Sequence, residues 1–303
     1  MGSPIRRMIA ALPAAPGVYR FRDGAGRALY VGRATELRAR VASYWGDLGD
    51  RRHLARMVAR IAAVEAVSCD SVHEAAWLER NLLEERLPRW NRTPGGQEVA
   101  AYLLLDRRRA TAGVRMVHEP GTPAAGVTVF GPYLGGLRAR QAIAALHRVH
   151  PLAYARTGLT GAERDLAAQR GVTATDRDDL AEAVASVLRR DPLAVASATE
   201  TLAGVRDRAA GALAFELAGR IQDELRALAW VTAPQQVTTD EPGDFAVQGW
   251  ADGVLVSFAM SGGRLRTWTQ RRTSRPAAPA PPHWAAFARR NAELAATLAR
   301  LHG

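Results

Sequence analysis

Alternating apolar and polar residues near the start of the chain predict a β-hairpin. The segments GVYRFRD (17–23) and RALYVGR (27–33) are rich in β-branched and aromatic residues, and the DGAG between them favours a tight turn. Leu37, Val41 and Tyr44 then recur at helical spacing, so a helix follows the hairpin.

The next stretch predicts two more helices with a strand between them. Apolar residues three or four apart indicate a helix over RRHLARMVARIAAV (51–64), and EAVSCDS (65–71) alternates as a strand does. A longer helix begins at Ser71, which forms a capping box with Glu74, and ends before Pro88. The order β-β-α-α-β-α indicates a compact domain with a small three-stranded sheet.

Beyond this domain the pattern is rich in strands, then helical, then rich in strands again. The expected elements are strands at 100–106, 114–120 and 126–136, a helix at 137–152, helices throughout 160–232, strands around two hairpin turns at 245–270, a proline-rich linker at 275–282 and a terminal helix at 283–301. No internal repeat is visible.

The fold class that follows is mixed α/β, of the α+β type. Four regions are expected: a small α/β domain at 8–95, a connecting region at 96–158, a helical region at 159–235, and a segment at 236–303 that holds the small β part, the linker and the terminal helix.

The charge of the chain favours a polyanionic partner. The net charge is +11, and all 41 basic residues are arginines. Most of the positive excess lies in residues 1–155, whereas residues 156–235 are net negative. Because alanine is abundant as well, part of the arginine content reflects codon usage in a GC-rich genome, and any single arginine is equally well explained as a solvated surface residue.

The cysteine content and the absence of long apolar runs exclude other classes of protein. Cys69 is the only cysteine, which excludes a disulfide framework and a cysteine-ligated cluster within one chain. No run of about 18 apolar residues is present, so we expect a cytoplasmic protein without a membrane partner.

Glu79 is the first candidate for chemistry on a phosphodiester. Hydrolysis of this bond needs an activated water and positive charge against the phosphate, which a hard cation held by one or two carboxylates supplies. Glu79 is the one carboxylate on the mainly apolar stripe of the 71–87 helix. Two partners would offset its burial, a metal ion or an arginine, and the sequence leaves both open.

The hairpin supplies the other candidate groups. Tyr30 is a candidate base if nearby cations lower its pKa, and Tyr19 would brace it or orient the water. Arg33 and Arg40 would provide that positive field and contact phosphate oxygens. Asn91 would fix the catalytic loop. Strand packing remains the alternative explanation for the tyrosines, and turn formation for Asn91.

Residues 12–91 resemble the GIY-YIG nuclease family in its UvrC-like form, the form found in excision-repair nucleases. The motifs LPxxPGVY, LYVG with a basic residue, LRxRV, EAxxLE and PRWN all occur in order and at the right spacing. The resemblance implies a metal-dependent DNA endonuclease of DNA repair, with Mg²⁺, or Mn²⁺ in its place, on Glu79. It implies these catalytic residues: Tyr19, Tyr30, Arg33 (usually lysine in the family), Arg40, Glu79 and Asn91. It implies these DNA-binding residues: Arg33, Arg38, Arg40 and Tyr44.

A weaker resemblance extends further along the chain. Residues 129–152 are similar to the FGPY stretch of the same family, and residues 212–228 are similar to its UVR motif, through which it contacts the UvrB-like helicase. The partner-binding residues would be Phe215, Glu216, Arg220 and Ile221. A plain amphipathic helix is the alternative.

Departures from the family pattern narrow the expected activity. The segment that carries four cysteines in the family has none here, so no iron–sulfur cluster is expected. The chain has no room for the second, RNase H-like nuclease, so we expect a single nick. Two alternatives remain: a non-catalytic adaptor that binds DNA or the UvrB-like partner, and a nuclease that acts on branched DNA or RNA.

Overall fold

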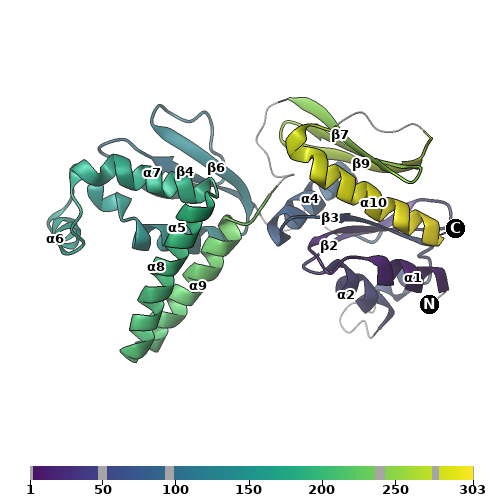
Figure 1. The fold of residues 1–303 in the computed structure, drawn as a ribbon, viewed down its shortest axis with the longest axis horizontal. Helices are drawn as coiled ribbons and strands as arrows, with labels where there is room; N and C mark the ends of the chain where they lie inside the picture. The colour runs from purple at the N-terminus through teal and green to yellow at the C-terminus, as the bar shows by residue number, and fades with distance from the viewer. Residues whose placement is uncertain (1–2, 47–52, 93–98, 236–242, 275–279, 303) are drawn as a thin grey trace. The chain divides into compact units, whose positions relative to one another are not determined.

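A computed structural model describes residues 3–46, 53–92, 99–235, 243–274 and 280–302 (Figure 1). The chain divides into two compact units. Unit 1 combines residues 1–97 with 234–303, and unit 2 comprises residues 98–233. No helix in the described ranges is long and apolar enough to cross a membrane. Most of the expected proline-rich linker, residues 275–279, lies outside the described residues.

The first sheet of unit 1 is antiparallel, in the order β2-β1-β3. It is accompanied by short helices and one long helix, α4. The elements are α1 (Ser3–Ala11), β1 (Gly17–Arg22), β2 (Ala28–Ala34), α2 (Leu37–Ala42), η1 (Ser43–Trp45), α3 (Ala55–Val58), β3 (Ala63–Ser68) and α4 (Val72–Glu85). The predicted hairpin and three-stranded sheet are confirmed, whereas α1 was not anticipated from the sequence.

The predicted helix over 51–64 is wrong for most of its length. Residues 51–52 lie outside the described residues, α3 covers only Ala55–Val58, and β3 already begins at Ala63. Pairing with β1 explains the change, because Arg22 is opposite Ala63 and its carbonyl accepts the N–H of Ala62 at 2.8 Å. Backbone pairing with a neighbouring strand therefore overrides the helical spacing of the apolar residues.

Side chains alternate between the two faces of this sheet and build two cores. Tyr19 and Phe21 lie in one core with residues of α1 and α2, such as Met8 and Leu37. Val18, Val31 and Val67 lie in the other, together with the apolar side of α4 and residues from the end of the chain. The two-residue period of the strand thus separates the tyrosine face from the face that α4 covers.

The C-terminal segment completes unit 1 with a three-stranded meander and a helix. The elements are β7 (Asp244–Ala251), β8 (Val254–Ser261), β9 (Arg264–Arg272), η5 (Pro282–Trp284) and α10 (Ala285–His302). The helix α10, yellow in Figure 1, packs against β3, β7 and β8. Its contact with β7 is close: a Cβ on Gly249 would lie 2.1 Å from the carbonyl oxygen of Ala288, so only glycine fits there. The strands and hairpin turns predicted for this region are confirmed.

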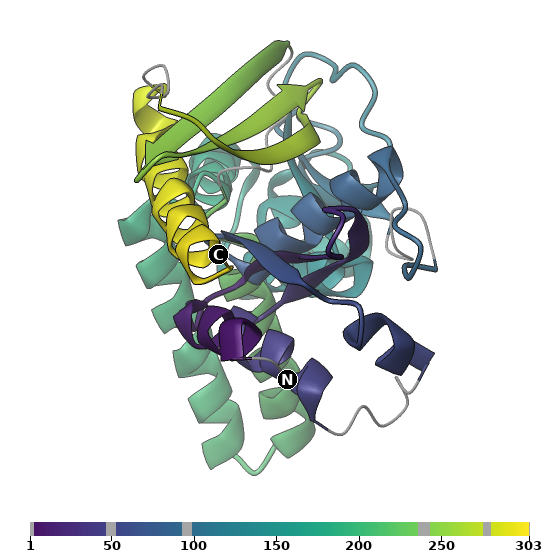
Figure 2. The same ribbon diagram turned by 90° about the vertical axis from the view of Figure 1, so that its right-hand side faces the viewer.

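Unit 2 has its own sheet, in the order β5-β4-β6, and a set of helices around one apolar core. The elements are β4 (Ala100–Asp106), β5 (Gly113–Val117), β6 (Val127–Leu134), α5 (Gly136–Val149), η3 (Leu152–Ala155), α6 (Gly161–Gln169), η4 (Ala174–Asp176), α7 (Arg177–Leu188), α8 (Pro192–Gly211) and α9 (Phe215–Val231). The two longest helices of this unit, α8 and α9, form a hairpin, visible as the paired green helices of Figure 2.

Candidate active site

Three tyrosines converge on the face of the sheet opposite α4. Tyr19 and Tyr44 are buried and their hydroxyl oxygens lie 2.8 Å apart, while Tyr30 is partly exposed. The three ring centroids are 6.0 to 6.2 Å from one another. Burial raises the pKa of Tyr19 and Tyr30, and the neighbouring Tyr44 adds to both shifts. Tyr19 and Tyr30 therefore rest as neutral phenols.

The close packing of this cluster depends on Gly32. The register of the hairpin places Tyr19 directly opposite Gly32. A Cβ on Gly32 would lie 2.5 Å from the hydroxyl oxygen of Tyr19 and 2.7 Å from a ring carbon of Tyr30, both impossible distances. Position 32 on β2 must therefore be glycine because Tyr19 lies directly opposite it on β1.

Glu79 lies on α4 and reaches the strand that carries Tyr30. One carboxylate oxygen accepts the backbone N–H of Arg33 at 3.1 Å, and the other lies 3.3 Å from the Arg33 side-chain Nε. Of the two partners left open by the sequence, an arginine is therefore present. The Glu79 side chain remains 21% exposed, so its carboxylate is still accessible from solvent.

A single carboxylate suits a magnesium ion that takes its other ligands from water and phosphate oxygens. No cluster of three or more His, Cys, Asp or Glu side chains that would hold a metal occurs within the ranges that the structure describes. Glu79 offers hard oxygen ligands that are accessible from solvent, so the residues present fit Mg²⁺ in this mode. They do not fit a zinc site, which needs three or four protein ligands.

Asn91 binds the outer edge of β2. Its side-chain oxygen accepts the N–H of Val31 at 3.0 Å, and its side-chain NH₂ donates to the carbonyl of Val31 at 2.8 Å. The preceding residue, Trp90, donates its backbone N–H to Leu29. This segment therefore fixes the backbone between Tyr30 and Gly32.

The predicted arginines have different surroundings. The Arg40 guanidinium lies 5.8 Å from the centre of the Tyr44 ring, and its charge opposes the rise in the pKa of Tyr19 and Tyr30. The charge of Glu79 acts on Tyr30 in the opposite sense, so both charged groups lie near that phenol. Arg33 contacts Glu79, whereas Arg38 donates to the carbonyl of Leu12 at 2.7 Å. A role of Arg38 in DNA binding stays a prediction.

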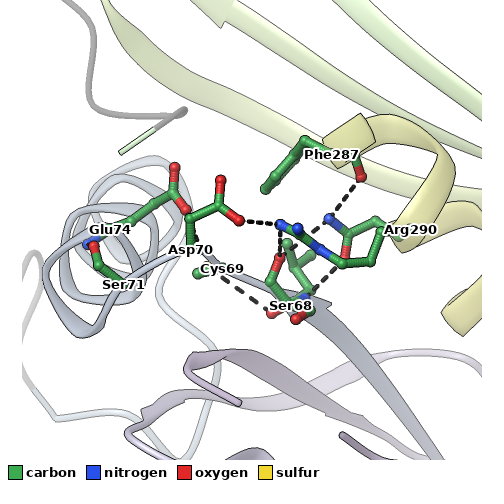
Figure 3. A network of polar contacts seen from close by, with 9 residues as sticks. Ser68, Cys69, Asp70, Ser71, Glu74, Phe287 and Arg290 are labelled. Carbon is green, nitrogen blue, oxygen red and sulfur yellow. Dashed lines mark hydrogen bonds and ion pairs between the residues drawn. The ribbon is translucent and has the colours of Figure 1, made fainter. Parts of the chain in front are cut away.

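A polar network beside α4, shown in Figure 3, was not anticipated from the sequence. Arg290 of α10 forms an ion pair with Asp70 at 2.6 Å and donates to the carbonyl of Ser68. Ser71 accepts the N–H of Glu74, and Glu74 in turn accepts the N–H of Asp70. The network thus holds the β3–α4 connection from which Glu79 projects two turns later. The sequence contains one sign of this network: Asn291 is a polar residue on the apolar stripe of α10, and its side chain binds the backbone of Ser68.

The four UVR-like residues divide into two groups in the structure. Phe215, Glu216 and Arg220 are exposed on α9, with Phe215 66% accessible, whereas Ile221 is fully buried in the core of unit 2. Ile221 therefore stabilises the helical hairpin, and the exposed three remain the candidates for partner binding.

Comparison with known proteins supports the assignment of the first domain. Residues 15–92 match the UvrC-like GIY-YIG domain family. UvrABC system protein C of Geobacter metallireducens is 36% identical over 142 residues, 46% of this chain and 23% of that protein. The Mycobacterium leprae protein of the same name is 31% identical over 277 residues, 86% of this chain and 42% of that protein. The chain thus spans less than half the length of these curated relatives.

Among solved structures, the GIY-YIG N-terminal endonuclease domain of UvrC from Thermotoga maritima, bound to magnesium, is 30% identical, with 30% of this chain and all of that chain covered and a TM-score of 0.28. The family match, over the residues that carry the tyrosine cluster and Glu79, identifies this part of the chain as a UvrC-like GIY-YIG domain.

Proposed function

We propose that this UvrC-like GIY-YIG domain is a metal-dependent endonuclease that hydrolyses one phosphodiester of DNA and makes a single nick during excision repair. The observation that carries the proposal is the contact of Glu79 with Arg33, which brings a carboxylate to the strand of Tyr30. The carboxylate that would hold the metal and the charge of Arg40 on α2 both act on the phenol of Tyr30, so a base and positive charge lie close enough to serve one phosphate.

Each side chain of the site has a role in hydrolysis that follows from its position. Arg33 and Arg40 bind the non-bridging phosphate oxygens. Tyr30 first releases its own proton to solvent, and the charge of Arg40 stabilises the phenolate that forms; the phenolate oxygen then orients the attacking water and accepts its proton. Tyr44 holds the Tyr30 hydroxyl from the buried side, and Tyr19 in turn holds Tyr44 through the hydrogen bond between their hydroxyl groups. Glu79 would hold Mg²⁺, or Mn²⁺ in its place, and the bound ion would supply positive charge against the phosphate and lower the pKa of a coordinated water.

The partners follow from the relatives. Proteins named UvrABC system protein C match most of this chain. We propose DNA as the substrate and a UvrB-like helicase as the partner, bound through the exposed Phe215, Glu216 and Arg220 of α9. The cytoplasm is the compartment that this substrate and partner imply.

Nicking of supercoiled plasmid in Mg²⁺ or Mn²⁺ tests the proposal. We expect the wild type to nick, Tyr30→Phe to lose at least about 100-fold in rate, the scale of a lost general base, and Glu79→Gln to lose at least as much because it would no longer hold the metal ion. Glu84→Gln is the matched control, because Glu84 lies on the same helix and pairs with Arg80 and Arg264 instead.

Direct metal binding gives a second measurement that does not depend on turnover. Mn²⁺ binding followed by electron paramagnetic resonance should weaken in Glu79→Gln and persist in Tyr30→Phe and Glu84→Gln. If the wild type fails to nick, alone or with a UvrB-like partner, the adaptor alternative replaces the endonuclease.

A further inference from the structure

Unit 1 contains a cavity of about 400 Å³ between the first hairpin, the end of α4 and strand β9. Leu82, Pro88 and Trp268 give it apolar walls. Five arginines from the same three segments also line it: Arg20, Arg22, Arg27, Arg86 and Arg266. Its volume is in the range of small-molecule sites. The β-strand register places it on the face of the sheet opposite the tyrosine cluster, since Arg20 and Tyr19 are neighbours on β1.

The arginines around this cavity outnumber the carboxylates that pair with them. The ion pairs are Arg20 and Arg22 with Glu65, Arg27 with Asp23, and Arg266 with Glu85. Three carboxylates therefore face five guanidinium groups. Arg86 is exposed, and no carboxylate in the described ranges pairs with it. The excess positive charge favours an anionic occupant, with Arg86 as the available contact.

Trp268 gives the cavity a fixed aromatic wall. The side chain is 2% exposed, and the Arg20 guanidinium lies 4.2 Å from the centre of its ring. Arg20 also donates to the carbonyl of Trp268 at 3.2 Å. The indole N–H is buried and has no acceptor within the described part of the chain. Basic grooves with fixed aromatic side chains are the usual surfaces for single-stranded nucleic acid.

We propose that this cavity receives an unpaired nucleotide of the DNA substrate, with its base against the wall formed by Leu82, Pro88 and the Arg20 guanidinium that stacks on Trp268, and its phosphate at Arg86. The inference rests on the proposed function, because the nucleotide belongs to the strand that is cut. The two sites share their framework: Val31 lines the cavity and follows Tyr30 on β2, and α4 carries both Glu79 and Leu82. A preference for DNA with an unpaired nucleotide near the nick follows.

Binding of labelled DNA to the full chain without divalent metal tests the proposal. The probes are a duplex with one unpaired thymidine and the same duplex fully paired, followed by fluorescence anisotropy over a range of salt. Arg86→Ala should weaken binding of the first probe about 3- to 10-fold and lower the slope of log K against log salt by about 0.7. Arg289→Ala, which removes an exposed arginine of α10, should leave both values near those of the wild type.

A variant without a change of charge distinguishes the contribution of the base to binding from that of the phosphate. Ala28 lines the cavity, so Ala28→Trp fills it. We expect this variant to lose the preference for the unpaired thymidine with its salt slope unchanged. If Ala28→Trp does not fold, as judged by circular dichroism, photo-cross-linking replaces it: a 5-iodouracil at the unpaired position should attach to the peptide that contains Trp268.

Two results overturn the inference: binding by Arg86→Ala and Ala28→Trp that equals binding by Arg289→Ala, or cross-links only outside β9. If either result is found while the wild type still nicks plasmid, the nucleotide site is disproved and the proposal of an endonuclease still holds. Loss of binding in Arg86→Ala together with a wild type that does not nick removes the catalysis and keeps the nucleotide site.

Discussion

Asn91 and Asn291 bind opposite edges of the same three-stranded sheet in the same manner. Asn91 exchanges two hydrogen bonds with the backbone of Val31 on β2, and Asn291 exchanges two with the backbone of Ser68 on β3. Each side chain presents its oxygen and its NH₂ as a neighbouring strand would present its own carbonyl and N–H. Each edge strand thereby has one residue whose backbone N–H and carbonyl are paired without another strand, which makes that position less available for edge-to-edge association.

Alanine at these two positions should separate stability from activity. Asn91→Ala removes the partner of the Val31 N–H and carbonyl, and Asn291→Ala removes the partner of the Ser68 N–H, while the Ser68 carbonyl keeps Arg290. We expect each variant to lower the free energy of unfolding by about 1–3 kcal/mol. Only Asn91 fixes the strand next to Tyr30. Urea unfolding and plasmid nicking at a temperature where both variants are folded should show two destabilised proteins, of which only Asn91→Ala is slow. Equal nicking by both would contradict a positioning role for Asn91.

Gly32→Ala should destabilise unit 1 and abolish nicking. The new Cβ would meet the Tyr19 hydroxyl at 2.5 Å, and relief of this contact must displace one of the tyrosines. We expect a loss of about 1–3 kcal/mol in the free energy of unfolding, as for other overpacked sites. Gly24→Ala is the control in the same hairpin, because nothing lies within 4 Å of its Cβ position. Thermal unfolding of the two variants side by side gives the comparison.

Asp106 should make the stability of unit 2 depend on acid pH. Hydrogen bonds from the Arg108 side chain, together with one from Thr111, hold the pKa of the Asp106 carboxyl at about 2. A carboxyl whose pKa is lower in the folded state stabilises the protein above its unfolded pKa, and that stability is lost as the pH falls toward 2. Because Arg108 is exposed, we expect about 1–2 kcal/mol at pH 6.

The measurement is the difference in unfolding free energy between wild type and Asp106→Asn at several pH values. The difference should be largest above pH 4 and should shrink between pH 4 and pH 2. A difference that does not vary with pH would show that the interaction of Asp106 with Arg108 does not depend on its charge.

The exposed and buried residues of the UVR-like helix should respond in opposite ways. Phe215→Ala removes a side chain that is 66% exposed, so we expect a change of less than about 0.5 kcal/mol in stability and weaker binding to a UvrB-like partner. Ile221→Ala empties a fully buried position and should cost about 2–5 kcal/mol. Calorimetric unfolding and a pull-down with the UvrB-like partner measure the two effects. Unchanged partner binding in Phe215→Ala would place the contact elsewhere.

Much of the first domain could be predicted from local sequence. The hairpin depends on a short-range pattern of β-rich segments and a turn, and the start of α4 depends on Ser71 and Glu74, three residues apart. Glu79 was identified as a candidate because a carboxylate on an apolar stripe needs a partner, and its contact with Arg33 supplies one. These features depend on residues that are close together in the sequence, so they can be predicted from one sequence alone.

Features that depend on distant parts of the chain could not be predicted in this way. The apolar residues before and within Ala63–Ser68 have helical spacing, and this segment forms a strand only because it pairs with β1. The attachment of α10 to β3 joins residues more than two hundred positions apart, such as Ser68 and Asn291. The need for glycine at position 32 follows from the hairpin register, which the turn sequence favours but does not establish alone.

The division of unit 1 into two separate stretches of sequence has a consequence for protein synthesis. On the ribosome, β3 is made before unit 2, and α10, which covers β3, is made after it. Until α10 emerges, the backbone of Ser68 lacks Asn291 and Asp70 lacks Arg290. In a nascent chain, Tyr19, Tyr30 and Glu79 would therefore be present before α10 supports their sheet, and full nicking activity should appear only after α10 has left the ribosome.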